Sequence, residues 1–363
     1  MNAQLNKIYH PRVAALRKEM KALGLDSFVT SSGATLRYLC GYSGSNGMLV
    51  VTGRATIFLT DFRYKESSQT SVAADKKFIT QGSLTKAAAE QKIFSPLKMV
   101  GYEKDKITVA DFEVKKEFIG EKKLVPTAGI SESLRSVKDT SELRTLKHAF
   151  DISDSVFDQI LDIIEPGMTE LELSAEISYL HKSFGAENDS FDVIVASGMR
   201  GSLPHGTATT KKLKRGEFIT LDFGCLFNGY HSDMTRTVCL GKPTAEMKKV
   251  YSIVQDAQQR SCDAVRSGVR ARDLDSIARE IITKAGYGKE FGHSLGHGVG
   301  LEIHELPRIA PKSTDILAEG NVITIEPGIY IPKKFGIRIE DTLVVRQNGF
   351  DVLTASPKEL ITL

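Results

Sequence analysis

The sequence has 363 residues, of which 41% are hydrophobic and 26% charged, with a formal net charge of +3. Globular domains contain about 100 to 250 residues, so this length predicts two domains. The small net charge gives no reason to expect a polyanionic partner, and no nucleic-acid binding is expected. No stretch approaches the roughly 18 apolar residues that cross a bilayer, so no membrane association is expected. The N-terminal stretch up to Leu23 is typical of an amphipathic helix and not of a signal peptide.

The four cysteines are scattered along the chain without CxxC spacing: Cys40, Cys225, Cys239 and Cys262. This distribution argues against a zinc knuckle and against a disulfide framework. We expect buried thiols that act as small hydrophobic side chains in a reducing cytoplasm.

Short helical patterns alternate with short β-type runs from residue 11 to about residue 130. The predicted order is a helix in RVAALRKEMKALG ended by Gly24, a strand in DSFVTS, and a hairpin of GMLVVTG with ATIFLTDFRY. The strand KKFITQG, a helix near SLTKAAAEQKIF, the strand KMVGYE, the helix TVADFEVKKEFI and the strand KKLVP follow. We predict an α/β domain over residues 1–132. It contains no phosphate loop and no clustered histidines or cysteines, so no chemistry is expected there.

From residue 133 onward the pattern predicts a separate α+β domain, 133–363. A long helix in SVKDTSELRTLKHAFDISDSVFDQILDII has Asp139 or Thr140 as its N-cap and Glu142 in its first turn, and Pro166-Gly167 stops it. A second helix, TELELSAEISYLHKSFGA, ends at Gly185. The remainder is largely β-type, with helices near 244–267 and 271–285.

The segment FITLDFGCLFNGYHSDMTRTV predicts a β-hairpin with its turn at Phe227-Asn228-Gly229. Asp222 lies in the first predicted strand and Asp233 in the second. A carboxylate among Ile, Leu, Phe and Val is costly to bury unless it is paired or binds a metal. Two acids that face each other across a hairpin would repel, and a cation would remove that repulsion.

Three further segments place acids or histidines beside strand-like apolar runs. FGHSLGHGVGLEIHE supplies His293, His297 and His304, and its many glycines exclude a regular helix, so the histidine spacing is not a helical zinc motif. In VITIEPGIYIP and GIRIEDTLVV, Glu326 and Glu340 lie at the ends of predicted strands.

Five of these residues suit a site for two metal ions: Asp222, Asp233, His297, Glu326 and Glu340. Their four carboxylates balance the charge of two divalent cations. In two-metal hydrolytic sites the ions lie about 3.5–4 Å apart, which requires bridging carboxylates. An oxygen-rich set with one nitrogen and no sulfur indicates Mn²⁺, with Co²⁺ or Zn²⁺ able to substitute.

These segments resemble the metallopeptidase family with the pita-bread fold, which includes methionine aminopeptidases, prolidases, Xaa-Pro aminopeptidases and creatinase. The resemblance covers essentially the whole chain. It implies a creatinase-type α/β N-terminal domain, a pita-bread α+β catalytic domain, and a homodimer in which the N-terminal domain of one subunit borders the active-site mouth of the other. Hydrolysis of the bond between an N-terminal residue and a following proline is the implied activity.

The resemblance also implies roles for the metal ligands. Asp222 looks like the bidentate ligand of one ion, and Asp233 and Glu340 look like the bridging carboxylates. His297 and Glu326 match the remaining ligands of the second ion, and Glu326 is also the candidate to handle the proton of the attacking water.

Other residues match positions around the substrate. His205 matches the family histidine that contacts the substrate near the scissile bond, and His304 the one that hydrogen-bonds the reacting amide and the oxyanion. His293 matches a substrate-pocket position, although a hydrogen bond to a metal ligand explains it equally well. Arg338 lies two residues before Glu340 and is expected to clamp a carboxylate. The remaining histidines, His10, His148, His181 and His231, are expected to be structural, and the basic run 211–215 a solvated loop.

Arg308 bears on the length of the substrate. Its guanidinium could bind the proline carboxylate of a dipeptide through two parallel hydrogen bonds, as the matching arginine does in prolidases. An exposed surface arginine is the alternative. We therefore expect an Xaa-Pro dipeptidase, with an Xaa-Pro aminopeptidase that acts on longer peptides as the alternative.

Three other functions fit less well. Methionine aminopeptidases usually lack an α/β domain of this kind, and creatinase lacks the acidic ligands. A non-catalytic peptide-binding module on the same fold typically has lost ligands, whereas all five are present here.

Overall fold

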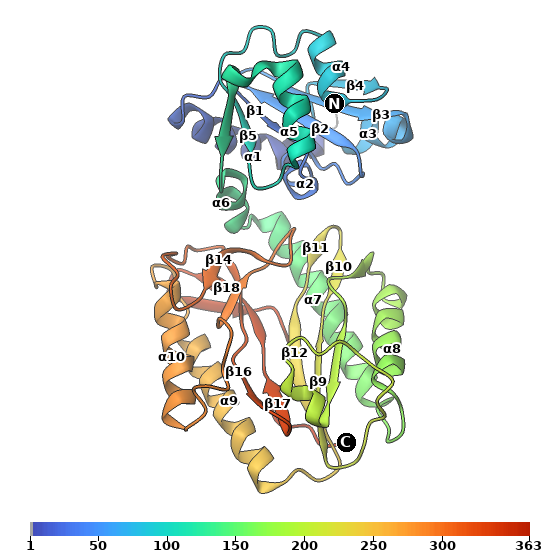
Figure 1. The fold of residues 1–363 in the computed structure, drawn as a ribbon, viewed down its shortest axis with the longest axis vertical. Helices are drawn as coiled ribbons and strands as arrows, with labels where there is room; N and C mark the ends of the chain where they lie inside the picture. Colours follow the sequence, from blue (N-terminus) through green and yellow to red (C-terminus); the bar gives the residue numbers. More distant parts are fainter. Residues whose placement is uncertain (1–2) are drawn as a thin grey trace. The chain divides into compact units, whose positions relative to one another are not determined.

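The computed structural model describes residues 3–363, and the chain divides into two compact units, Met1–Arg135 and Ser136–Leu363 (Figure 1). Each unit has hydrophobic clusters of its own. Val50, Leu59 and Val100 lie in the cluster of the first unit, and Ile219 and Ile323 in two clusters of the second. Within residues 3–363 no helix has the length and apolar character that a bilayer crossing requires. All four cysteines are buried and free, as their spacing predicted.

The N-terminal unit is built on a six-stranded mixed sheet in the order β4-β3-β2-β1-β5-β6. Its strands are β1 (Ser27–Thr30), β2 (Gly47–Thr52), β3 (Thr56–Asp61), β4 (Lys76–Thr80), β5 (Val100–Glu103) and β6 (Leu124–Thr127). Its helices are α1 (Ala3–Ala22), α2 (Gly33–Cys40), α3 (Lys65–Ser71), α4 (Leu84–Glu90), α5 (Val109–Lys115) and α6 (Ile130–Ser136), which crosses into the second unit. The strand β1 pairs antiparallel with β2 and parallel with β5.

The predicted hairpin is confirmed, with Leu49 opposite Phe58 in the register of β2 and β3. Gly24 has φ +67 just beyond α1, in agreement with its predicted role as the residue that ends the helix. The sequence did not predict α2 or α3. The helix α2 is only 8 residues long, and five of them are buried, so packing stabilises a helix that would be marginal alone.

The C-terminal unit opens with two capped helices, α7 (Thr140–Leu161) and α8 (Glu170–Ser183). Asp139 is the N-cap of α7, and its side chain accepts from the N–H of Glu142 at 3.0 Å. Glu142 reaches back to the N–H of Asp139, also at 3.0 Å, which completes a capping box. Asp139, one of the two predicted caps, is therefore the residue that fixes the start of this helix.

Strands and two further helices form the rest of this unit. They are β7 (Asn188–Asp189), β8 (Ile194–Ser197), β9 (Glu217–Phe223), β10 (Cys225–Phe227), β11 (Tyr230–His231), β12 (Met234–Leu240), α9 (Ala245–Asp263), α10 (Ala271–Lys284), β13 (Gly296–Gly298), β14 (Glu305–Ile309), β15 (Val322–Ile325), β16 (Gly328–Ile331), β17 (Phe335–Arg338), β18 (Asp341–Arg346) and β19 (Gly349–Val352). The main sheets have the orders β12-β9-β8 and β14-β13-β15-β18-β19.

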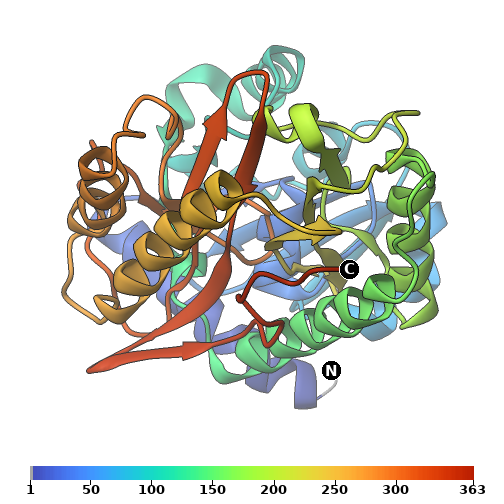
Figure 2. The same ribbon diagram turned by 90° about the horizontal axis from the view of Figure 1, so that it is seen from below.

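These elements form two similar halves, each with a pair of helices that covers antiparallel strands. The helices α7 and α8 pack on the strands of the first half, and Figure 2 shows α9 (gold) lying across the red strands of the second. The halves meet where the N–H of Glu340 donates to the carbonyl of Thr235 at 3.1 Å. Two residues further along β12, Thr237 donates from Oγ1 to the carbonyl of Arg338 at 3.0 Å. The acidic segments of both halves are thereby brought side by side.

Candidate metal centre and active site

The two aspartates come from the first half. In the antiparallel pair of β9 and β12, Asp222 stands opposite Thr235. Asp233 does not lie within a strand, as the sequence predicted, but immediately before β12. Gly224 lies close to the residue before Asp233, since a Cβ on Gly224 would lie 1.9 Å from the carbonyl oxygen of Ser232. Only glycine permits this close backbone approach, which sets the position of Asp233 beside Asp222.

Glu340 joins the aspartates from the second half. Asp222, Asp233 and Glu340 are all buried, and one carboxylate oxygen of each lies within 4.8 Å of the others. Thr235 donates from Oγ1 to Oε2 of Glu340 at 2.8 Å. The other oxygen, Oε1, is buried and accepts no hydrogen bond from any of residues 3–363. A buried oxygen without a partner is costly unless a ligand satisfies it.

The electrostatics of this cluster disfavour full ionisation in the absence of a cation. Burial and the charges of Glu340 and Asp222 raise the pKa of Asp233 well above its usual value. Burial and nearby Glu340 raise that of Glu326 in the same way, and burial with Asp222 raises the pKa of Glu340 to about 8. The repulsion is the one that the sequence predicted for acids that face each other.

His297 presents an unprotonated nitrogen to the cluster. Its Nδ1 donates to the carbonyl of Gly298 at 3.0 Å, and burial lowers the pKa of the ring to about 4, so the ring is neutral with its proton on Nδ1. The remaining nitrogen, Nε2, lies 3.4 Å from Oε1 of Glu326 and 3.5 Å from Oδ2 of Asp233. Because both carboxyl groups have raised pKa values, these contacts are favourable when either a carboxyl proton or a cation lies between the atoms.

Arg338 connects this cluster to the surrounding polar groups. It donates to Oδ2 of Asp222 at 2.5 Å, to Oγ1 of Thr235 at 3.0 Å and to the hydroxyl of Tyr330 at 2.6 Å. The Tyr330 hydroxyl in turn lies 3.0 Å from Nε2 of His293, whose Nδ1 donates to the carbonyl of Ser294. The carboxylate that Arg338 clamps is thus Asp222. His293 is linked to it through Tyr330 and Arg338.

The remaining predicted residues lie at the exposed side of the centre. The rings of His304 and His297 are 4.3 Å apart, edge to face. Burial, His205 and Arg308 lower the pKa of His304, and Asp222 raises it, so all these groups lie close enough to act on one another. His205, His304 and Arg308 are exposed. The backbone N–H of Arg308 donates to Asp315, and its guanidinium is not fixed by that contact.

The sequence did not single out Tyr330, Thr235 or Thr324. Thr324 donates to Oε1 of Glu326 at 3.3 Å and accepts from the N–H of His297 at 3.0 Å, so it orients two of the predicted ligands. Thr235 lies two positions after the predicted ligand Asp233, and Thr324 lies two positions before the predicted ligand Glu326. Residues two apart in a strand share a face, and that periodicity could have identified both threonines.

A divalent cation fits this donor set. Oε1 of Glu340 accepts no hydrogen bond from residues 3–363, Nε2 of His297 faces two carboxylates, and three buried acids gather beside the charges of Arg338 and Arg236. Carboxylate oxygens with one imidazole nitrogen suit metals such as Mn²⁺, Co²⁺ and Zn²⁺. Asp222, Asp233, His297, Glu326 and Glu340 are the residues that could hold such ions.

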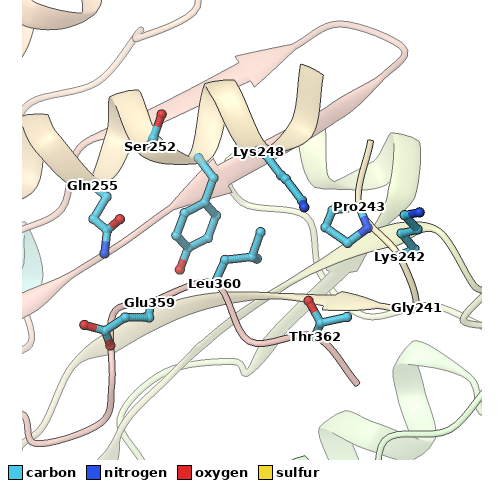
Figure 3. Close-up of a pocket in the computed structure, with 10 residues that line it drawn as sticks. Gly241, Lys242, Pro243, Lys248, Ser252, Gln255, Glu359, Leu360 and Thr362 are labelled. Atoms are coloured by element: carbon cyan, nitrogen blue, oxygen red, sulfur yellow. The ribbon is translucent and has the colours of Figure 1, made fainter. Parts of the chain in front are cut away.

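A different hollow of this unit carries no such chemistry. It has a volume of about 610 Å³ and lies between the start of α9 and the C-terminal segment of the chain (Figure 3). Gly241, Tyr251, Gln255 and Thr362 are among its lining residues. None of the predicted metal ligands or histidines lines it, so the candidate active site is the carboxylate centre.

The fold and this centre define a metallopeptidase. Residues 144–347 match the model of metallopeptidase family M24, and residues 12–137 match the creatinase/prolidase N-terminal domain. The chain belongs to metallopeptidase family M24. The predicted fold class, a creatinase-type α/β domain followed by a pita-bread α+β domain, is confirmed.

Individual relatives extend over the whole chain. The Xaa-Pro dipeptidase of Pyrococcus furiosus is 40% identical over 357 residues, 96% of this chain and 99% of that protein. The structure of the Xaa-Pro dipeptidase from Bacillus anthracis superposes with a TM-score of 0.95 at 39% identity and covers 98% of this chain and 100% of that one. The X-Pro aminopeptidase from Thermotoga maritima has a TM-score of 0.89 at 35% identity, over 95% of this chain and 100% of that one.

Proposed function

We propose that this protein is an Xaa-Pro dipeptidase that uses two divalent metal ions to hydrolyse the bond between an N-terminal residue and a following proline. The observation that carries the proposal is the buried group of Asp222, Asp233 and Glu340, together with the free Nε2 of His297. Relatives named Xaa-Pro dipeptidase, over nearly the full chain, support the substrate class.

The metal ligands are proposed as follows. Asp222 would hold one ion, Asp233 and Glu340 would be shared by both ions, and His297 and Glu326 would complete the ligand set of the second. When bound, the two ions supply a water of lowered pKa and polarise the scissile carbonyl. Mn²⁺ is the proposed metal because the donor set is rich in oxygen, with Co²⁺ or Zn²⁺ able to replace it.

The side chains around the ions bind and orient the substrate. Glu326 would take up the proton of the attacking water at its carboxylate. Burial keeps His304 neutral at pH 7, so its ring N–H is available to the carbonyl oxygen as negative charge develops there. His205 contacts the substrate beside the same bond.

Arg338 holds Asp222 in place, and His293 borders the pocket and supports Arg338 through Tyr330.

Selectivity for proline follows from the chemistry of the bond. An X-Pro bond is a tertiary amide without an N–H, so a site that requires this donor rejects it. For a dipeptide the proline carboxylate lies one residue beyond the scissile bond and needs a cation. Arg308 is exposed beside His304, and we propose that it binds this carboxylate.

An Xaa-Pro aminopeptidase that acts on longer peptides is the second candidate, because a structure with that name also covers nearly the whole chain. Turnover of Gly-Pro, Ala-Pro and Ala-Pro-Pro with added Mn²⁺ separates the two. We expect kcat/KM for Ala-Pro to exceed that for Ala-Pro-Pro. A preference for the tripeptide would assign the protein to the aminopeptidases, and no cleavage of any of the three would refute both candidates.

The ligand roles have their own test. Asp233→Asn and Glu340→Gln should lower activity more than Asp222→Asn, because a bridging carboxylate serves both ions. Chelation should abolish activity, and Mn²⁺ or Co²⁺ should restore it. Full turnover by protein shown to be free of metal would exclude the two-metal mechanism.

We further propose a cytoplasmic homodimer whose catalytic domain is residues 133–363. Four free, buried cysteines suit a reducing compartment. The dimer rests on the family resemblance and on the position of every proposed ligand outside residues 1–132. Light scattering should give twice the chain mass, and a fully active monomer would refute the dimer.

A further inference from the structure

The N-terminal unit, which supplies none of the proposed metal ligands, contains a cavity of about 360 Å³. All of its lining residues belong to that unit. Cavities that bind small molecules typically have volumes of about 300 to 1,000 Å³, so this one is large enough for a compact metabolite. Its location and one of its side chains indicate what it could bind.

The cavity lies where the sheet reverses its direction of winding. The strands β1 and β5 are parallel neighbours (Figure 1). They end at Thr30 and Glu103, which both line the cavity. The chain leaves β1 through α2 toward β2, and it leaves β5 through α5 toward β6 on the opposite side. Adjacent strands whose connections diverge in this way open a crevice at their carboxyl ends, where α/β proteins bind ligands.

Lys115 indicates the charge of the ligand that the cavity could bind. It lies at the end of α5, lines the cavity, and is only 6% exposed. Its ammonium group makes no hydrogen bond or ion pair with any of residues 3–363. The side chain is buried while its nitrogen is accessible from the cavity, and burial lowers the pKa of Lys115. A π-helical turn, η2 (Lys116–Gly120), follows it directly, and such turns often occur at functional sites.

The acidic residues of the cavity do not satisfy this ammonium. Asp111 lies one turn earlier on α5, where it is exposed and accepts from the hydroxyl of Thr108 at 2.7 Å. Its charge raises the pKa of Lys115 without outweighing burial. The carboxylate of Glu103 is occupied by three hydroxyl donors, Thr30, Thr35 and Ser131. An acceptor for Lys115 must therefore come from outside this set.

The start of α2 gives further support. Ser32 is its N-cap residue and lines the cavity, but its side chain makes no capping hydrogen bond. The first N–H groups of a helix favour negative charge, and Ser32 places the start of α2 at the cavity wall. Ser31, Ser45 and Asn46 add neutral hydrogen-bonding groups to the wall.

We propose that this cavity binds a small oxyanion, a carboxylate or a phosphate, which pairs with the ammonium group of Lys115. The ligand is distinct from the peptide substrate, since the proposed metal ligands all belong to the other unit. The protein then has a second small-molecule site, in the unit for which the sequence predicted no chemistry.

Methionine methyl groups provide a local reporter for the test. Met48 lines the cavity and is 1% exposed, whereas Met234 adjoins Asp233 in the metal centre. Full-length protein labelled with ¹³C at the methionine methyls is titrated with inorganic phosphate and, separately, with acetate, up to about 50 mM. Sodium chloride at equal ionic strength is the blank. A shift at Met48 reports the cavity, and a shift at Met234 reports binding at the metal centre.

We expect a saturable shift of Met48 with at least one anion, and the anion that acts distinguishes phosphate from carboxylate ligands. Lys115→Met, of similar length but without charge, should weaken this binding at least about tenfold. Lys115→Gln provides a second variant that keeps a polar end. The matched control is Lys116→Met, which removes the neighbouring, partly exposed lysine that pairs with Glu121, and it should bind as the wild type does.

The thermal stability of the Lys115 variants provides an independent test of the role of this residue. Because an unpaired ammonium is removed from the interior, Lys115→Met should raise the Tm in anion-free buffer by about 2 °C or more. The proposal is overturned if Met48 shows no saturable shift with either anion, or if Lys115→Met and Lys115→Gln bind as tightly as the wild type. A lower Tm of Lys115→Met together with unchanged binding would establish a purely structural lysine.

Discussion

Arg338 donates from Nη2 to Oδ2 of Asp222 at 2.5 Å, although the two residues lie 116 positions apart in the chain. Both side chains are almost fully buried, with 4% and 12% of their surfaces exposed. The contact orients the carboxylate of Asp222, one oxygen of which lies within 4.8 Å of the acids Asp233 and Glu340. Side chains that orient a metal ligand in this way typically contribute 10- to 100-fold in metal affinity.

Arg338→Met is therefore expected to weaken metal binding about 10- to 100-fold, measured by competition with a chelator. The matched control is Arg346→Met. Arg346 pairs with Asp351 at the surface, with 39% and 60% of the two side chains exposed, and such pairs contribute little. Equal metal affinity in the two variants would contradict the role of Arg338.

The pKa of Glu340 predicts how the ion-free protein responds to pH. Between about 4.5, its usual pKa, and about 8, its folded pKa, the folded protein holds a proton that the unfolded chain has lost. Stability therefore falls as pH rises through this window, since the folded state binds more protons. Asp233 and Glu326 act in the same direction. Melting of chelated protein from pH 5 to pH 8 measures the effect.

Two comparisons sharpen this experiment. Glu340→Gln should reduce the loss of stability, and saturating Mn²⁺ should abolish it, because metal binding requires ionised carboxylates and releases their protons. Calorimetry of metal binding in two buffers of different ionisation enthalpy counts the released protons directly. A chelated protein that becomes more stable as pH rises would contradict the raised pKa values.

His304 is expected to act on the transition state. His304→Ala should lower kcat by about 100-fold or more with unchanged metal content, the usual effect of removing one donor to an oxyanion. His148→Ala is the matched control, because His148 is exposed and packs against Phe227, 4.3 Å between ring centres. Loss of metal from His304→Ala would make His304 a ligand instead.

Arg308 distinguishes dipeptides from longer substrates. Arg308→Ala should raise KM for Ala-Pro at least about tenfold, or some 1.4 kcal/mol, and barely change KM for Ala-Pro-Pro. Lys312→Ala removes an exposed positive charge nearby in the sequence and should affect neither peptide. Equal effects of Arg308→Ala on both substrates would exclude a contact with the dipeptide carboxylate.

Gly224 gives a prediction for the geometry of the centre. A Cβ there would lie 1.9 Å from the carbonyl oxygen of Ser232, so Gly224→Ala must displace the segment that carries Asp233. Both metal affinity and Tm should fall. Gly292→Ala is the control, because nothing lies within 4 Å of a Cβ at that position. Normal metal affinity of Gly224→Ala would contradict this prediction, because it would show that the backbone can adjust without moving Asp222 and Asp233.

Local patterns predicted much of this molecule. Asp139 and Glu142 identified the start of α7, and each proposed metal ligand was found as an ionisable side chain beside an apolar run. The short helix α2 was not found, since tertiary packing and not its own pattern stabilises it.

Contacts between distant segments could not be predicted from spacing. That Arg338 clamps Asp222, and that Tyr330 connects it to His293, depends on how β12 packs beside residues 338–340. Periodicity within one strand places a residue on a face, but it does not identify the neighbour across that face.

The two halves of the C-terminal unit each contribute two acidic residues of the proposed metal site, Asp222 and Asp233 from the first half and Glu326 and Glu340 from the second. During translation, Asp222 and Asp233 are synthesised before Glu326 and Glu340. A nascent or truncated chain that stops before Glu326 therefore has two acids and no complete site, and it should not retain ions at low concentrations. Ion capture should follow the folding of both halves and, by mass action, favour the completed chain over its fragments.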